Sequence, residues 1–264
     1  MIRHATLKDE EALESLCSSI HEDDYVIEFL HRWLSHNEIF LFERGVILGM
    51  IRLIYSRDGK AHLGAIRVHP ESRREGIGTA LTRYCISVCG ADTVRLSIMD
   101  NSPSQALAEK IGFSPVATFT LLMKQEDIET AAPTESEEVT PLTVLSSLNH
   151  SPQFAKNHGL LSSCFTFYHP SESILKELQL LVHGDRVAVL DYNIDEAFSH
   201  AVQIAYCDPD PSLLESILWE AARNACKEIW AIVYQDPALI ALLEDYGFKK
   251  EEWAETIDVY ELPL

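Results

Sequence analysis

The sequence predicts an α/β (α+β) fold in two domains. Up to residue 125, segments that alternate polar and apolar residues like strands are interleaved with segments of helical period. The stretch Glu126–Pro141 (EDIETAAPTESEEVTP) then has no apolar period and is rich in Glu, Thr, Ala and Pro, which is typical of a linker. We therefore expect a domain over 1–125, an acidic linker over 126–141 and a second domain over 142–264.

The first domain is expected to begin with a strand and two helices, continue through three strands, and end with two helix–strand pairs. The expected elements are strand 2–6, helices 8–19 and 23–35, strands 38–43, 46–56 and 60–69, helix 76–89, strand 93–99, helix 103–111 and strand 114–124. The helix over 103–111 has the clearest boundaries. Ser102 is a predicted N-cap, Pro103 is the first helical residue and Gln105 completes a capping box. Gly112 then ends the helix.

The most informative segment is the loop Arg73-Arg74-Glu75-Gly76-Ile77-Gly78-Thr79, between an expected strand and an expected helix. A helix N-terminus offers free backbone N–H groups and partial positive charge, and glycines let a phosphate approach the main chain. The two arginines add charge-assisted hydrogen bonds to phosphate. The loop therefore predicts a phosphate-bearing ligand.

Two standard phosphate motifs do not fit this loop. A Walker loop requires a lysine after its second glycine, and there is no lysine here. A dinucleotide fingerprint requires Gly-x-Gly-x-x-Gly, and its third glycine would fall on Leu81. A nucleotide-dependent enzyme is therefore a poor interpretation.

The pattern that remains, Arg/Gln-x-x-Gly-x-Gly/Ala, resembles the acyl-CoA pyrophosphate loop of the GNAT N-acetyltransferase superfamily. A second family signature follows in the family's order: Asn101 at a strand end, a short helix, and Gly112-Phe113. The resemblance covers nearly all of residues 1–125. It implies a mixed, mostly antiparallel sheet flanked by helices, and acetyl-CoA as the donor substrate.

The resemblance also assigns the donor contacts. Main-chain groups of the strand before the loop hold pantetheine and thioester in the family, main-chain amides and arginines of the loop hold the pyrophosphate, and Asn101 contacts the pantetheine arm. We add Ser104, in the helix that follows Asn101. The predicted cofactor-binding residues are Ile66, Arg67, Val68, Arg73, Arg74, Glu75, Gly76, Ile77, Gly78, Thr79, Asn101 and Ser104.

The catalytic acid and base are less well marked. Many family members have a Tyr four residues before the Gly of Gly-Phe, where this sequence has Ala108, and Tyr84 or Tyr55 are substitutes by residue type alone. Several relatives carry a base where this sequence has His62, whose ordinary pKa suits proton transfer near neutrality. His62 is the predicted catalytic residue, against the alternative of a surface or core histidine.

Acceptor recognition has only general candidates. Asp24, Tyr25 and Glu28 fall in the helical region that usually walls the acceptor site in the family. They could recognise an amine, and the alternative is a charged, solvated helix face. The acceptor itself, a small-molecule amine or a protein amine, cannot be chosen from the fold.

The second half resembles a degenerate copy of the first. With an offset of 135 residues, Gly78–Phe113 aligns with Leu213–Phe248 without a gap, and Tyr246-Gly247-Phe248 matches Ile111-Gly112-Phe113. At the position of the phosphate loop stands Cys207-Asp208-Pro209-Asp210-Pro211, whose aspartates would repel pyrophosphate. We expect a degenerate GNAT-like domain without bound CoA, against the alternative of an ordinary α/β domain.

Composition and charge restrict the classes of partner that we expect the protein to bind. Residues 1–125 carry 14 Lys+Arg and 16 Asp+Glu, whereas residues 126–264 carry 7 and 25, so nearly all of the −20 net charge lies in the second half. Such acidity argues against nucleic acid as a partner. No apolar run reaches membrane-spanning length, and six scattered cysteines and eleven histidines form no metal motif. We expect a cytoplasmic protein, a monomer or weak dimer, with no metal.

These observations favour an acyl-CoA-dependent N-acyltransferase. An amine attacks the thioester carbonyl directly in such enzymes, so no covalent cysteine intermediate is needed. The alternative is a non-catalytic acyl-CoA-binding or protein-interaction module on the same scaffold. Ala108 and the degenerate second half favour the alternative, whereas the intact phosphate loop favours at least CoA binding.

Overall fold

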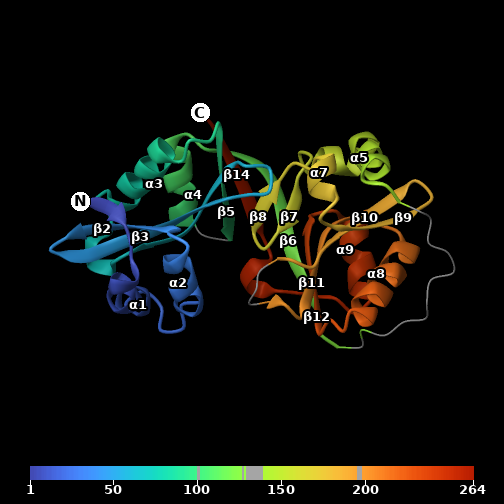
Figure 1. Ribbon diagram of the computed structural model, residues 1–264, viewed down its shortest axis with the longest axis horizontal. Coiled ribbons are helices and arrows are strands. Elements are labelled where there is room, and N and C mark those ends of the chain that lie inside the picture. The colour runs from blue at the N-terminus through green and yellow to red at the C-terminus, as the bar shows by residue number, and fades with distance from the viewer. Residues whose placement is uncertain (100–101, 127, 129–138, 195–197) are drawn as a thin grey trace. The chain divides into compact units, whose positions relative to one another are not determined.

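The computed structural model describes residues 1–99, 102–126, 128, 139–194 and 198–264, and the chain forms two compact units (Figure 1). The first unit comprises residues 1–96, 102–114 and 261–264, and the second comprises 97–101 and 115–260. Asn101 and most of the expected linker lie outside the described residues.

The first unit is built on strands in the order β1-β2-β3-β4-β5. Its elements are β1 (Ile2–His4), α1 (Glu10–Ser18), α2 (Val26–Ser35), β2 (Ile39–Arg44), β3 (Val46–Tyr55), β4 (Ala61–Val68), α3 (Ile77–Val88), β5 (Thr93–Met99) and α4 (Ser102–Ile111). Neighbouring strands are antiparallel except for β4 and β5, which are parallel. The expected helices and strands of this region are all confirmed, with ends shifted by at most three residues.

Helices cover both faces of this sheet, with α1 and α2 on one side and α3 on the other (Figure 1). On α2, the buried residues Val26, Leu30, Trp33 and Leu34 recur at intervals of three and four, so one helical face turns to the sheet. They meet Met50 of β3 in a continuous apolar cluster.

Helix α3 approaches the opposite face closely because β3 carries Gly49. A Cβ atom at this position would lie 2.9 Å from Cγ2 of Ile77 and 3.0 Å from the carbonyl oxygen of Arg67. The glycine therefore sets how near the first turn of α3 lies to β3 and β4. No sequence pattern pointed to Gly49, because its role depends on two elements distant in the chain.

The last residues of the chain also belong to the first unit. Arg95 of β5 is 1% exposed and forms ion pairs of 2.6 Å with Asp58 and with Glu261. The amide of Leu264 donates to the carbonyl oxygen of Asp92 at 2.8 Å. A buried arginine requires such partners, since an unpaired buried charge is strongly destabilising.

The second unit repeats much of this pairing pattern. Its main sheet runs β14-β6-β12-β11-β10-β9, with β13 paired to β6, and β7 and β8 form a separate hairpin. The elements are β6 (Ser114–Lys124), α5 (Pro141–His150), α6 (Pro152–Lys156), β7 (Leu161–Ser163), β8 (Thr166–Tyr168), α7 (Glu172–Leu175), β9 (Gln179–His183), β10 (Arg186–Asp191), β11 (Ala201–Cys207), α8 (Pro211–Arg223), β12 (Glu228–Tyr234), α9 (Pro237–Asp245), β13 (Lys249–Lys250) and β14 (Ile257–Pro263).

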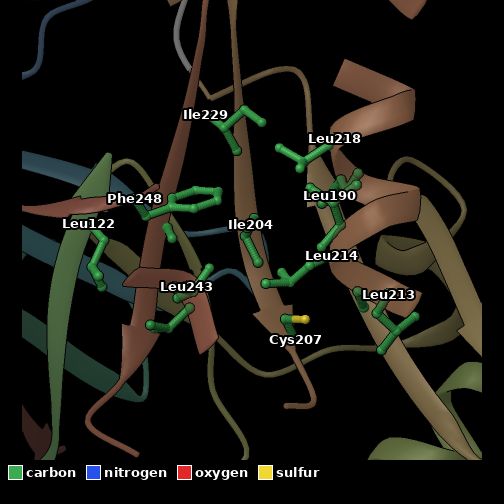
Figure 2. Packing of buried hydrophobic residues seen from close by; sticks show 14 of the residues in the cluster. Leu122, Leu190, Ile204, Cys207, Leu213, Leu214, Leu218, Ile229, Leu243 and Phe248 are labelled. Carbon is green, nitrogen blue, oxygen red and sulfur yellow. The ribbon is translucent and has the colours of Figure 1, made fainter. Parts of the chain in front are cut away.

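Pairing along β9-β10-β11-β12 is antiparallel, antiparallel and parallel, the same succession as β2-β3-β4-β5. The sequence offset of 135 carries β5 onto β12 residue for residue, and each strand precedes a helix ending before a Gly-Phe pair. Alternate residues of β10 face opposite cores. Ala188 and Leu190 join the cluster beneath α8 and α9 that is drawn in Figure 2, and Val187 and Val189 pack against α5.

We predict that Gly49→Val destabilises the first unit by roughly 1–3 kcal/mol, because the added side chain forces α3 or β4 to move. Gly64→Ala on β4 is the matched control, since a Cβ atom there has no heavy atom within 4 Å. Chemical denaturation of the full chain compares the two variants. Equal stability of both would show that α3 does not depend on the close contact.

Candidate functional site

The candidate site lies where β4 stops pairing with β5. The two strands pair from Ala61↔Val94 to Leu63↔Leu96, and no later pair joins them within the part of the chain that the structure describes. Two residues after Leu63, Ala65 has a φ of 48°, and the register between β3 and β4 shifts at this level. This β-bulge redirects β4 while it stays paired with β3.

Beyond the bulge, β4 presents main-chain groups on its free edge. The amide of His69 donates to the carbonyl oxygen of Leu48 on β3 at 2.9 Å. Since main-chain groups alternate sides along a strand, Arg67 turns its groups to β3, and Ile66 and Val68 turn theirs to the opposite edge. Within the predicted contact segment 66–68, Ile66 and Val68 therefore turn main-chain groups to the edge that pairs with β5 only as far as Leu63.

The side chain of Arg67 makes contacts that sequence reasoning missed. It forms a bidentate ion pair with Asp24, at 2.6 and 2.7 Å, and its Nη1 donates to the carbonyl oxygen of Ile66 at 3.1 Å. Tyr25 lies over the same guanidinium, 5.4 Å from the ring centroid. Asp24 is buried, and the pairing with Arg67 outweighs burial and holds the pKa of its carboxyl below its usual range. The ion pair between Asp24 and Arg67 therefore links the turn before α2 to β4.

Downstream of β4, the predicted phosphate loop is exposed and ends at an uncapped helix. Arg73, Arg74, Glu75 and Gly76 are exposed, and α3 begins at Ile77 after Gly76, an N-cap residue that has no side chain to accept from the first amides of the helix. Arg74 and Gly76 both lie in the left-handed region, with φ of 66° and 84°. For Arg74 this conformation is strained, and such strain persists chiefly where the surrounding structure enforces it, often at ligand sites.

The other predicted donor residues lie around the start of α3. At Gly78 a Cβ atom would lie 3.4 Å from both Ile66 Cδ1 and Leu107 Cδ2, so the absence of a side chain lets α3 sit against β4 and α4. Thr79 is half-buried one residue further on, and Ser104 is half-buried in the first turn of α4. The Glu75 carboxylate forms an ion pair with Arg44, with 3.1 Å between Oε2 and Nη1.

His62, the predicted base, is 4% exposed within β4. Its Nδ1 has no hydrogen-bond partner among the described residues. Burial first, and then the charges of Arg52 and Arg95, lower the pKa of the imidazole from 6.5 to about 3. A neutral, buried imidazole with so low a pKa is a weak proton acceptor, which does not suit the predicted role.

The tyrosines named as substitutes for the missing acid have structural contacts. Tyr55 donates its hydroxyl proton to the carbonyl oxygen of Cys89 at 2.6 Å, where α3 ends. Tyr84 packs edge-on against Phe40 with ring centroids 5.5 Å apart. Ala108, at the usual Tyr position, is buried in α4. None of these observations supplies a proton donor.

The corresponding place in the second unit is closed by its own side chains. Asp210 caps α8 by accepting from the amide of Leu213 at 3.1 Å, so a carboxylate already occupies the helix N-terminus. Ser162 of β7 donates to the carbonyl oxygen of Ile232 on β12 and accepts from Gln203 of β11. Ser162 thus hydrogen-bonds to both of the parallel strands, β11 and β12.

Two further properties concern the described residues as a whole. Among them, no cluster of three or more His, Cys, Asp or Glu side chains is arranged to hold a metal ion. Likewise, none of the helices over the described ranges combines the length and apolarity needed to span a membrane.

Comparison with known proteins finds a family match in the first half of the chain. Residues 6–113 match the family described as Acetyltransferase (GNAT) family. The mycothiol acetyltransferase of Mycolicibacterium vanbaalenii is 34% identical over 92 residues, which cover 34% of this chain and 31% of that protein. That of Mycobacterium avium is 34% identical over 70 residues, covering 26% and 22%. The chain therefore spans less than a third of the length of these curated relatives.

Solved structures resemble the whole chain. A GCN5-related N-acetyltransferase from Sphaerobacter thermophilus has a TM-score of 0.62 at 16% identity and covers 100% of this chain and 95% of its own. One from Kribbella flavida has a TM-score of 0.53 at 11% identity and covers 100% and 71%. At these identities the likeness establishes the fold, and it extends over both halves.

The lowered pKa of His62 predicts a pH-dependent loss of stability. Between pH 6.5 and about 3 the unfolded chain holds a proton on His62 that the folded chain does not, so folding weakens as the pH falls through this window. From pH 7 to 5 the loss from this group is about 2 kcal/mol. Urea unfolding at several pH values should show a shallower decline for His62→Leu. Parallel curves for parent and variant would contradict the depressed pKa.

Proposed function

Because residues 6–113 belong to the GNAT acetyltransferase family, we propose that this chain is an acyl-CoA-dependent N-acyltransferase that transfers acetyl from acetyl-CoA to a primary amine. The observation that carries the proposal is the exposed loop after β4, with Arg73 and Arg74 beside the uncapped N-terminus of α3. Free amides, a helix dipole and two guanidinium groups form a site for a pyrophosphate.

In this proposal the donor lies along the edge of β4 and ends at the loop. Main-chain groups of residues 66–68 bind pantetheine and thioester, and Arg73–Thr79 bind the pyrophosphate. Gly76, in the left-handed region, and Gly78, against β4, keep the loop free of side chains that would block it. Asn101 and Ser104 complete the donor set as predictions.

The chemistry is a direct transfer. The nitrogen of a neutral amine forms a bond to the thioester carbonyl carbon, the carbon–sulfur bond breaks, the amine loses a proton and the departing thiolate gains one. A main-chain N–H on the free edge of β4, such as that of Val68, is placed to stabilise the developing oxyanion. His62 as the base stays a prediction, but its burial and low pKa favour water as the proton acceptor.

For the second half we propose a degenerate GNAT-like domain over 142–264, separated in the sequence by the linker 126–141 from the acyltransferase domain over 1–125. The compact units differ from these bounds, because residues 115–125 belong to the second unit and residues 261–264 to the first. The repeated strand pairing and the 135-residue offset support a tandem origin. Its loop lacks arginine and glycine, and Asp210 caps the helix, so we propose that it binds no acyl-CoA.

The acceptor is proposed to be a small molecule rather than a protein, because the matching relatives are named for mycothiol. A non-catalytic acyl-CoA-binding module remains a second candidate. It is favoured by the burial of Ala108 and His62, which leaves the family's usual acid and base positions without suitable groups.

Calorimetric titration of acetyl-CoA into the full chain should give micromolar binding with one site per chain. Gly76→Glu and the double change Arg73→Ala/Arg74→Ala should each weaken binding at least tenfold, because phosphate contacts are lost. Arg186→Ala, which removes a half-exposed arginine of the second unit, is the matched control. Absence of binding to acetyl-CoA and to longer acyl-CoAs would contradict the donor site.

Binding separates the two candidate functions only when turnover is measured beside it. Acetylated product from a panel of amines supports the transferase. Binding with no turnover of any amine supports the non-catalytic module.

A further inference from the structure

Arg52 of β3 has a fixed guanidinium with two free amino groups. Its Nε donates to Glu38 at 2.7 Å, and its guanidinium lies over the buried ring of Trp33 at 4.2 Å from the centroid. Nη1 and Nη2 have no hydrogen-bond partner among the described residues, although the side chain is only 22% exposed. Two contacts thus hold the group in place and leave its bidentate edge unused.

Open space lies directly beside this arginine. Arg52 is the register partner of Gly64 on β4, so both residues face the same side of the sheet, the side covered by α2. A Cβ atom at Gly64 has no heavy atom within 4 Å. Glycine weakens a strand, and in a strand interior it often marks a bulge, a tight bend, or a close approach of a ligand or of another backbone.

The neighbours of Gly64 are polar. His62, two residues earlier and therefore on the same face, has an Nδ1 without a partner in the described structure. Arg95 is the register partner of His62, but its guanidinium is bound by Asp58 and Glu261. Arg67 is likewise bound by Asp24. Of these three arginines around Gly64, Arg52 is the one whose terminal amino groups have no partner in the described structure.

This place lies next to the proposed reaction centre. The bulge at Ala65 follows Gly64 directly, and the edge assigned to the thioester begins at Ile66. A ligand above Gly64 therefore lies beside the segment at which an amine would attack, on a part of β4 that the donor contacts do not use.

We propose that Arg52 binds a carboxylate on the acceptor, so that the substrate is an amine that also carries a carboxylate. The inference rests on the proposed acyltransferase function and narrows its substrate class. The planar guanidinium edge matches a carboxylate in a bidentate arrangement, and its half-buried position strengthens the charge-assisted hydrogen bonds. Trp33 and Glu38 orient the group before the substrate binds.

The test compares acceptors that differ only in the carboxylate. Glycine, β-alanine and 4-aminobutyrate are paired with methylamine, ethylamine and propylamine, and release of CoA thiol is measured with the full chain. The carboxylated member of the best pair should have a kcat/KM at least tenfold higher. Arg52→Met should raise its KM by about tenfold to a hundredfold and leave the corresponding amine and acetyl-CoA binding unchanged.

Matched variants separate recognition from folding. Arg223→Met removes another arginine that pairs with a Glu at 2.9 Å and lies over a Trp at 4.7 Å, but in the second unit, and should have no effect. Gly64→Val fills the open space and should also raise the acceptor KM while acetyl-CoA binding persists. Arg52→Lys keeps a charge without the bidentate edge and should fall between parent and Arg52→Met.

The outcomes distinguish this inference from the proposed function. Acetyl-CoA binding and amine turnover that show no preference for carboxylates, or a preference untouched by Arg52→Met, would overturn the inference and leave the acyltransferase standing. Absence of acetyl-CoA binding would overturn the proposed function instead.

Discussion

The end of the pairing between β4 and β5 at Leu63 is the constraint on which the first unit depends. Paired along their whole length, the two strands would satisfy each other and leave no main-chain group for a ligand. The bulge at Ala65 allows β4 to keep its pairing with β3 while its other edge becomes free. The exposed loop and the first turn of α3 then continue from this edge.

The second unit has the same succession of strands with different side-chain contacts around it. It keeps the parallel pair β11–β12, but Ser162 and Gln203 hydrogen-bond across that pair, and Asp210 supplies the cap that α3 lacks. Side chains here satisfy groups that a phosphate would otherwise bind, and carboxylates oppose an anion. Similar folds in the two halves therefore do not imply similar binding.

The sheet face beneath α2 carries arginines that form ion pairs with carboxylates. Arg67 and Arg95 are each held by carboxylates in bidentate or paired contacts, so their charges are compensated where water is scarce. Burial first, and then the charges of Arg52 and Arg95, lower the pKa of His62 and keep its imidazole neutral. Sequence reasoning chose His62 for its ordinary pKa, and the folded environment changes that property, because Arg52 and Arg95 come from strands that the local pattern around His62 does not reveal.

Periodicity, capping residues and glycine spacing are local signals, and from them the sequence predicts the helices and strands of the first unit, which the structure confirms. The same signals predict a phosphate loop and a likeness between the two halves. The sequence also places Ala108 where many members of the GNAT family have a Tyr. Three contacts are visible only in the folded chain. Gly49 lets α3 pack closely against β3, Asp24 forms an ion pair with Arg67, and Arg52 faces open space at Gly64. These contacts join residues far apart in the chain, and strand register and burial, which set them, are properties of the assembled sheet.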